Sequence, residues 1–235
     1  MTLCGRCGEA LDMEGVRFAG QFSEGLLCSP CRMAPPEFER AVAYAVYQDE
    51  LREMVHLLKY ERMSAVARPL GRMLARAIEM IEAEAGKDLL VVAVPLFPSK
   101  ERERGYNQAV LLSDAALTEL KKKRPAWRLQ AAHGAIRRVK DTRSQFELTP
   151  TGRRRNLQGA FAVADGLAVK GREVLLVDDI YTTGATARAC SRVLRRAGAS
   201  KVWVATVSRA QPEMVAAWDL AARDAASQTA VWDAG

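Results

Sequence analysis

The sequence lacks any apolar run long enough to cross a membrane. Its longest, LLVVAVPLF from Leu89 to Phe97, is interrupted by Pro95, whereas a membrane helix needs about 20 apolar residues. The N-terminus also lacks a charged segment followed by an apolar one, so no secretory signal peptide is expected. These two absences predict a protein of the reducing cytoplasm that does not insert into a membrane.

Aromatic side chains and histidines are scarce as well. Only 6% of the residues are aromatic, and no basic cluster is densely interleaved with them, so a platform for stacking nucleic-acid bases is not evident. The chain has two histidines, His56 in an amphipathic stretch and His133 near the end of an expected strand. Neither lies in an acid–base constellation, so we expect structural roles for both and no catalytic triad.

The composition provides for a packed core. Hydrophobic residues make up 49% of the 235 residues, and there are only 16 glycines and 9 prolines, which excludes a disordered or fibrous chain. At about 150 residues per domain, this length predicts one full domain with a smaller companion. The net charge of +7 suits acidic ligands, phosphates or nucleic acid without requiring any of them.

Four cysteines at the start of the chain have the spacing of a metal site. The pairs Cys4-x2-Cys7 and Cys28-x2-Cys31 are separated by residues 8–27, near the edge of the range for paired zinc knuckles. A closed shell of four thiolates leaves no place for water, so we expect a structural zinc. The alternatives, two disulfides or four unrelated thiols, are disfavoured by the reducing compartment and by the spacing.

The chain is expected to divide near the Pro35-Pro36 pair. Residues 1–36 would form the zinc domain, which is too small to build its own core, and residues 37–235 a second domain. The fifth cysteine, Cys190, falls in an expected helix and reads as a small buried hydrophobe.

The second domain alternates strand and helix patterns. Strands are expected at 38–47, 89–94, 173–177 and 201–207, and helices at 49–59, 64–86 with Ser64 as the N-cap, 107–120 and 185–197. The last strand, helix and strand form a βαβ unit, whose strands are parallel neighbours. Together these elements predict a three-layer α/β fold with a parallel sheet.

Residues 136–156 have no periodic pattern. They carry seven basic and two acidic side chains, together with Pro150 and Gly152. Long loops of this kind inside a compact domain are usually lids or binding loops, so a mobile lid is expected here. Exposed charge on a solvated loop is the alternative, and the basic run Lys121–Arg124 can be read in the same way, as a solvated helix end.

The segment VLLVDDIYTTGAT, Val174–Thr186, has the pattern of a phosphate-binding loop. A buried strand delivers Asp178 and Asp179, and a turn rich in hydroxyls and glycine then opens a helix. Backbone N–H groups at that turn and the hydroxyls of its threonines can bind a phosphate, and Gly184 permits close approach. Two carboxylates beside a phosphate suggest ribose hydroxyls or a ligand-held cation as their partners. A phosphorylated ribose meets both demands.

The sequence does not contain either of two other nucleotide-binding motifs. The stretch Gly166-x4-Gly171 precedes its strand and lacks the Lys and Ser/Thr of a Walker loop. No G-x-G-x-x-G follows an expected strand, so a dinucleotide fingerprint is absent too.

VLLVDDIYTTGAT resembles the phosphoribosyl pyrophosphate (PRPP) motif of type I phosphoribosyltransferases. Three further segments narrow the resemblance: HLLKY at 56–60, VPLFPSKERERGYNQA at 94–109 and KDTRSQFELTPTGRRRNLQGAF at 140–161. With the four-cysteine leader, the chain resembles the ComF family of competence proteins from Cys4 to about Arg209. A tail at about 211–235 lies outside the resemblance.

The resemblance implies a set of site residues. Asp178 and Asp179 would meet the ribose hydroxyls, Thr182–Thr186 would bind the 5′-phosphate, and the turn after Val94 would be the pyrophosphate loop, with Arg102 nearby. The implied PRPP-binding residues are Asp178, Asp179, Tyr181, Thr182, Thr183, Gly184, Ala185, Thr186, Pro98, Ser99, Lys100, Arg104 and Asn107. In the lid, Lys140, Thr142, Gln145, Arg155 and Asn156 fit the family pattern. The implied catalytic residues are Asp178, Asp179, Lys140 and Arg155, with Mg²⁺ bound alongside PRPP.

The resemblance also implies a process, DNA uptake in natural transformation. An active enzyme would displace pyrophosphate at ribose C1, but whether the chain is active stays open. The alternatives are a non-catalytic, PRPP-sensing module that binds single-stranded DNA, a phosphoribosyltransferase with a small-molecule acceptor, and a scaffold whose zinc leader docks a helicase or another DNA-uptake protein.

Overall fold

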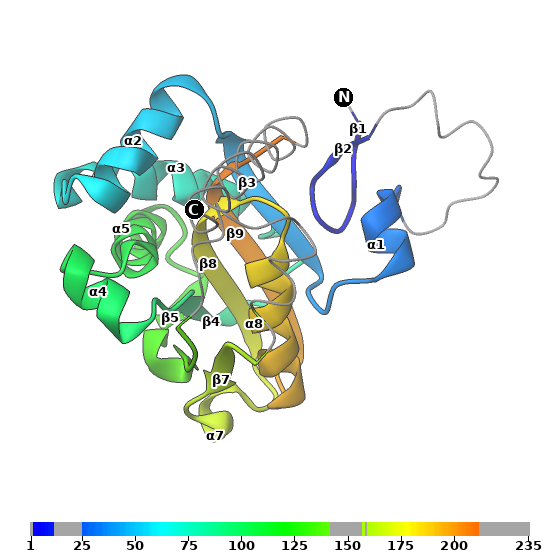
Figure 1. The fold of residues 1–235 in the computed structure, drawn as a ribbon. Coiled ribbons are helices and arrows are strands. Elements are labelled where there is room, and N and C mark those ends of the chain that lie inside the picture. Colours follow the sequence, from blue (N-terminus) through cyan, green and yellow to red (C-terminus); the bar gives the residue numbers. More distant parts are fainter. Residues whose placement is uncertain (1, 12–24, 142–156, 158, 212–235) are drawn as a thin grey trace, which may run out of the picture.

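A five-stranded parallel sheet forms the centre of the computed structural model, which describes residues 2–11, 25–141, 157 and 159–211. The strand order is β3-β9-β8-β4-β5, and each neighbouring pair is parallel. The strands are β3 (Arg40–Val46), β4 (Asp88–Ala93), β5 (Arg128–Ala131), β8 (Glu173–Tyr181) and β9 (Lys201–Arg209) (Figure 1). The predicted α/β class with a parallel sheet is confirmed.

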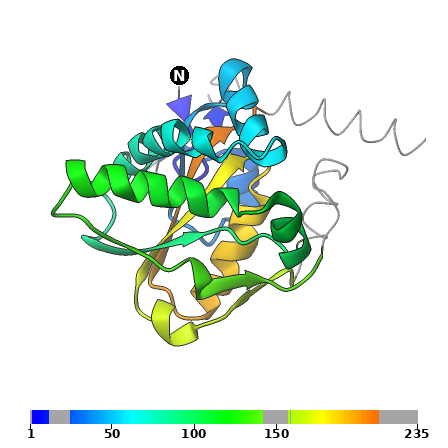
Figure 2. The ribbon, with the colours of Figure 1, turned by 90° about the vertical axis from the view of Figure 1, so that its left-hand side faces the viewer.

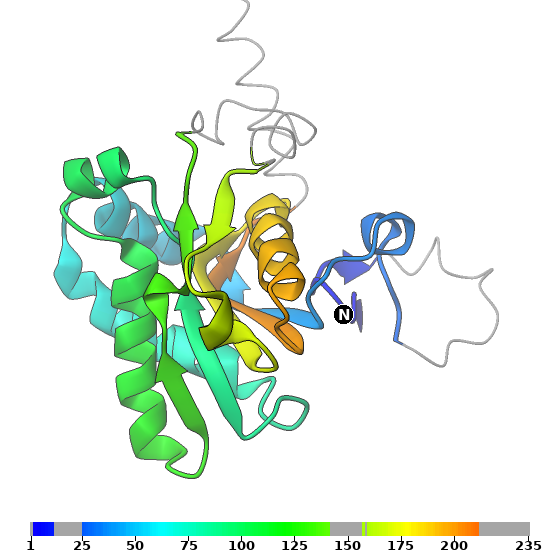
Figure 3. The ribbon, with the colours of Figure 1, turned by 90° about the horizontal axis from the view of Figure 1, so that it is seen from below.

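Helices cover both faces of this sheet. One face carries α2 (Asp49–Tyr60), α3 (Ala67–Glu79) and α5 (Gln108–Lys123), and the other carries α8 (Ala185–Arg196) (Figure 3). Because strand side chains alternate between faces, β8 sends Leu175 into the core under α3 and α5 and Leu176 into the core under α8. The buried strands therefore read as continuous apolar runs, as expected for a parallel sheet.

Helices α3 and α5 lie side by side across their face of the sheet (Figure 2). Gly71 in α3 makes this approach possible, since a Cβ there would lie 2.3 Å from the Cβ of Ala115 in α5. A glycine inside a helix lowers helix propensity, so here close packing explains its presence.

The remaining described elements are short. They are β1 (Thr2–Leu3), β2 (Ala10–Leu11), α1 (Ser29–Met33), η2 (Ser64–Val66), α4 (Pro98–Arg104), η3 (His133–Ala135), β6 (Ile136–Arg138), β7 (Phe161–Val163) and α7 (Gly166–Val169). The pairs β1–β2 and β6–β7 are antiparallel. Among the described helices, none combines the length and apolar character that a membrane span requires.

Several expected boundaries differ in the structure, and the helix expected at 64–86 ends at Glu79. Ser64 does not cap the second helix, because it begins the turn η2 and its side chain makes no capping hydrogen bond. The predicted loop at 136–156 begins later, since Ile136–Arg138 pair with β7, and residues 142–156 lie outside the described part. The strand that carries the two aspartates continues to Tyr181.

The connections of β4 and β8 diverge at their carboxyl ends. The chain leaves β4 toward α5 on one face and leaves β8 toward α8 on the other, although the two strands are neighbours. In open α/β sheets, ligands bind outside such a switch point. The segment that begins at Asp178 lies at this position.

Candidate functional site

A small hollow lies at the carboxyl end of β8. Its lining includes Val94 at the end of β4, Asp178 and Tyr181 of β8, and Thr182 and Gly184 of the following turn. The predicted phosphate-loop residues Ala185 and Thr186 line the same hollow from the first turn of α8. The structure therefore places most of the predicted ribose-phosphate residues around one hollow, whereas Asp179 and Thr183 are not among its lining residues.

Gly184 gives the loop its shape. It is the N-cap of α8 and has a φ of +73°, a region that favours glycine. A Cβ at this position would lie 2.1 Å from the hydroxyl oxygen of Tyr181, so that side chain occupies the space above the glycine. Thr183 Oγ1 is buried and has no hydrogen-bond partner within the described part of the chain. A buried hydroxyl without a partner is costly, and a phosphate oxygen would satisfy it.

Asp178 borders the hollow and is half-buried. Its Oδ1 accepts the backbone N–H of Asp179 at 2.9 Å. Burial, and next the negative charge of Asp179, raise the pKa of Asp178 to about 7. The carboxyl group therefore changes its charge near neutral pH.

Asp179 is buried and takes part in an ion pair. Its Oδ1 lies 2.9 Å from Nζ of Lys59, at the C-terminal end of α2. Its Oδ2 is buried and finds no hydrogen-bond partner among the described residues. A buried carboxylate oxygen with a free lone pair is suited to a hydroxyl donor of a ligand.

Lys59 lies in the segment HLLKY at 56–60, which contributes to the family resemblance, but no role was predicted for it. A signal was available: Leu51, Val55 and Lys59 recur at the four-residue spacing of one helix face. A lysine that continues an apolar stripe at this spacing is directed toward the protein, where it requires a partner.

The predicted pyrophosphate-loop residues lie on a helix. Pro98, Ser99, Lys100, Arg102 and Arg104 belong to α4, so the turn after β4 is confined to residues 94–97. The sequence predicted these residues in a loop, and the structure places them on a helix. Their contact with a ligand stays a prediction.

Asn107 has a structural part in the fold. Its side chain caps α5 by accepting the N–H of Ala109 at 2.9 Å, and it donates to the carbonyl of Val94 at 3.0 Å. The residue thereby ties the turn after β4 to α5, while its predicted ligand contact stays a prediction.

The start of the predicted lid is described, but most of it is not. Arg138 of β6 packs over the ring of Phe161, 5.5 Å from the ring centre, and Lys140 lies beside Gly159 across the hairpin. Thr142, Gln145, Arg155 and Asn156 lie outside the described residues.

Both histidines make local contacts. His133 accepts the N–H of Ala93 at Nδ1, 3.2 Å away, so its Nε2 proton faces Asp114 at 3.1 Å. His56 lies against the ring of Tyr60, with ring centres 4.8 Å apart. These contacts agree with the structural roles expected of both.

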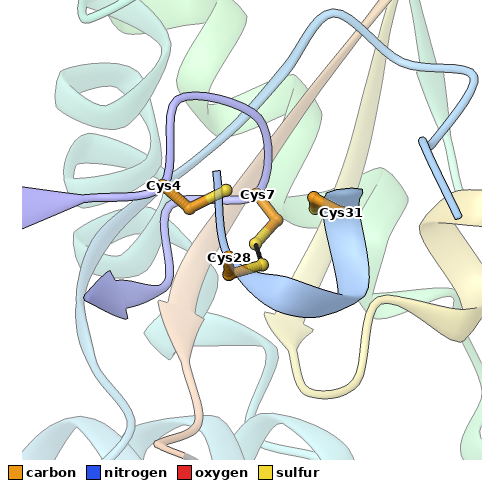
Figure 4. Close-up of side chains that lie close together, drawn as sticks. All are labelled: Cys4, Cys7, Cys28 and Cys31. Atoms are coloured by element: carbon orange, nitrogen blue, oxygen red, sulfur yellow. Dashed lines mark hydrogen bonds between the residues drawn. The ribbon is translucent and has the colours of Figure 1, made fainter. Parts of the chain in front are cut away.

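The four leader cysteines form a cluster (Figure 4). Cys4, Cys7, Cys28 and Cys31 are buried, and their sulfur atoms all lie within 4.8 Å of one another. Four sulfurs at about 2.3 Å from a zinc ion would be about 3.8 Å apart. The donor set and the spacing therefore fit a tetrahedral thiolate site, and the cluster can bind a metal ion such as zinc.

The thiols of this cluster strongly affect one another. A hydrogen bond with Cys31 lowers the pKa of Cys7 to about 5, while burial raises the pKa of Cys28 to about 11. The thiolate form of Cys7 is thus favoured while Cys28 holds its proton, and metal binding requires deprotonated thiols.

Two arginines connect the cluster to the hollow. Arg209, at the end of β9, donates to the carbonyl of Cys7 and lies 4.3 Å from the ring centre of Tyr181. Arg188, in the first turn of α8, donates to Sγ of Cys31 at 3.6 Å. The cluster is therefore linked to α8 through Arg188 and to Tyr181 of β8 through Arg209. Neither arginine was expected, because contacts between distant segments leave no local pattern.

The sequence is similar to those of proteins named for DNA utilization and for competence. It is 34% identical over 206 residues to the DNA utilization protein YhgH of Salmonella typhi, covering 87% of this chain and 82% of that protein. It is 30% identical over 210 residues to competence protein F of Haemophilus influenzae, covering 88% and 84%. No family model matches the chain.

Solved structures with partial similarity include phosphoribosyl enzymes. A hypoxanthine phosphoribosyltransferase from Staphylococcus aureus matches with a TM-score of 0.35 at 14% identity, over 65% of this chain and 75% of that one. A phosphoribosylpyrophosphate synthetase from Mycobacterium smegmatis matches with a TM-score of 0.34 at 19% identity, over 60% and 33%.

Proposed function

This chain belongs to the family of competence protein F and the DNA utilization protein YhgH, and on that basis we propose that it binds PRPP with Mg²⁺ at the carboxyl end of β8. Binding there would serve the uptake or use of DNA that the names of its relatives indicate. A structural zinc in the four-cysteine cluster completes the proposal.

Two unpartnered polar atoms in the same segment carry the proposal. Thr183 Oγ1 offers a hydroxyl in the loop, and Asp179 Oδ2 offers a carboxylate oxygen at the end of the strand. A phosphate accepts hydrogen bonds and a ribose hydroxyl donates them, so a ribose phosphate would satisfy both atoms. The α8 N-terminus, with Gly184 as its N-cap, adds backbone N–H donors for the phosphate.

In the proposed complex each residue has a distinct task. Asp178 and Asp179 accept the ribose hydroxyls, and Thr182, Thr183 and Thr186 donate to the 5′-phosphate. Mg²⁺ would neutralise charge on the pyrophosphate when bound with it. Lys140 and Arg155 of the predicted lid would add positive charge around the pyrophosphate, and closure of such a lid would exclude water.

A release assay separates an enzyme from a PRPP sensor. We expect the protein to bind PRPP in the presence of Mg²⁺, and we propose measuring pyrophosphate release with and without single-stranded DNA, and DNA binding at 50 and 200 mM salt. Release with DNA or with a small-molecule acceptor would identify a transferase. Binding without release, together with DNA affinity that falls steeply with salt, would identify a PRPP-responsive DNA-binding protein. Failure to bind PRPP would overturn the proposal.

A further inference from the structure

The ion pair that joins α2 to β8 is buried. The side chains of Lys59 and Asp179 are only 12% and 5% exposed, and their charged atoms lie 2.9 Å apart. Replacing a buried ion pair with apolar side chains is often neutral or stabilising. The pair is therefore weak evidence for stability and points to a task at the site.

The geometry of Asp179 shows what that task can be. Lys59 contacts Oδ1, while Oδ2 is buried without a partner among the described residues. An ammonium group held on one oxygen by a charge-assisted hydrogen bond restricts the rotation of the carboxyl group. The second oxygen is then left as an acceptor in a defined position.

We propose that Lys59 is a positioning residue of the candidate site, one that orients Asp179 for a hydroxyl donor of the ligand and places a positive charge beside Asp178. This inference rests on the proposed binding of PRPP at β8. It assigns to α2 a part in the site that the strand and loop motifs do not indicate.

The charges around the two acids determine how this role can be measured. Asp178 is faced by Asp179, by Lys59 of α2, by Arg138 of β6 and by Cys190 of α8. Asp179 is faced by Asp178 and Lys59, with the Tyr47 hydroxyl nearby. Of the two nearby cations, Lys59 lowers the pKa of Asp178 more strongly than Arg138 does.

Lys59 itself stays charged across the relevant pH range. Burial lowers its pKa, but attraction to Asp179 and then to Asp178 outweighs that effect, so the pKa lies above its ordinary value. Its removal therefore takes away a constant positive charge. Asp178 would then hold its proton up to higher pH, because a neighbouring cation favours the charged form of a carboxyl group.

The test is the pH dependence of PRPP affinity in Lys59→Met, measured from pH 6 to 9 with Mg²⁺. Wild-type affinity is expected to rise through about pH 7, as Asp178 ionises. In Lys59→Met the midpoint is expected to shift upward by about 1 pH unit. The affinity should be at least roughly fivefold lower at pH 7, since one pKa unit is tenfold in proton affinity. The gap to the wild type should narrow toward pH 9, where only the loss from the misoriented Asp179 remains.

Two variants serve as controls. Lys59→Arg retains the charge and should keep the wild-type midpoint. Lys201→Met removes a partly exposed lysine that pairs with Glu173 at 3.4 Å, at the opposite end of the sheet, and should leave the profile unchanged. Titration of PRPP itself is common to all variants and cancels in the comparison. If Lys59→Met does not fold, Lys59→Gln takes its place, with the same expected shift.

The outcomes separate this inference from the proposed function. A wild-type protein that does not bind PRPP overturns both. Wild-type binding with a Lys59→Met profile that is lower by the same factor at every pH, or unchanged, overturns only the role of Lys59, because damage to packing would not be repaired at high pH.

Discussion

Replacing Gly184 with alanine is expected to lower PRPP affinity by at least about 100-fold, which is the loss of roughly two hydrogen bonds to a charged group. The new Cβ would lie 2.1 Å from the Tyr181 hydroxyl oxygen and 2.5 Å from Cζ. The ring has little room to move, because it packs edge-on against Phe38 and is covered by Arg209. The loop must shift instead, and its N–H groups shift with it.

Gly171→Ala is the matched control for this variant. Gly171 has a φ of +74°, close to the +73° of Gly184, but no atom lies within 4 Å of a Cβ built there. Both variants carry the backbone cost of a left-handed alanine, about 1 kcal/mol, and only Gly184→Ala carries the clash. Calorimetry and thermal unfolding of both variants distinguish the effects. Equal affinity losses in the two variants would contradict the assigned role of Gly184.

Replacing Cys28 with serine is expected to remove the bound zinc and to destabilise the protein by several kcal/mol. Structural zinc sites contribute on the order of 10 kcal/mol to the folding of small metal-binding units. The loss is expected to extend beyond the leader, because the four cysteines share a contiguous core with buried residues of α8 such as Leu194. Metal content by mass spectrometry and unfolding by denaturant measure the two effects.

Cys190→Ala controls for the loss of a buried thiol. Cys190 is fully buried on α8, and burial raises its pKa well above the ordinary value, so it stays a neutral thiol. Its replacement should cost about 1–3 kcal/mol, as for other core truncations, and should leave one zinc per chain. A wild-type protein purified without zinc, or a Cys28→Ser variant that retains it, would refute a structural zinc site.

The elements predicted from the sequence are those with local patterns. The βαβ unit from β8 to β9 was predicted because the buried strands are apolar throughout and Gly198 follows the helix. The cysteine cluster was predicted from its spacing alone, and the structure brings the four sulfurs together. In both cases the information lies within a short segment.

The contacts that complete the site join segments far apart in the chain. The ion pair between Lys59 and Asp179 joins α2 to β8, with α3, β4, α5 and β5 among the elements between them in sequence, and the link from Arg209 to Cys7 spans nearly the whole chain. The helix α4 was missed because its residues, PSKERER, have no apolar stripe. Long-range pairing and short polar helices leave little periodic signal, so only the structure could place them.

Calorimetric titration of PRPP with Mg²⁺ into the wild type and into Asp178→Asn/Asp179→Asn tests the proposed ligand site most directly. Asp88→Asn/Asp114→Asn, which removes two exposed carboxylates, controls for the change in net charge. We expect the wild type and the control to bind and the site variant to lose about 100-fold or more, since hydrogen bonds to charged groups contribute about 1.5–3 kcal/mol each. Unchanged binding in the site variant, or no binding in the wild type, would show that the carboxyl end of β8 is not a PRPP site.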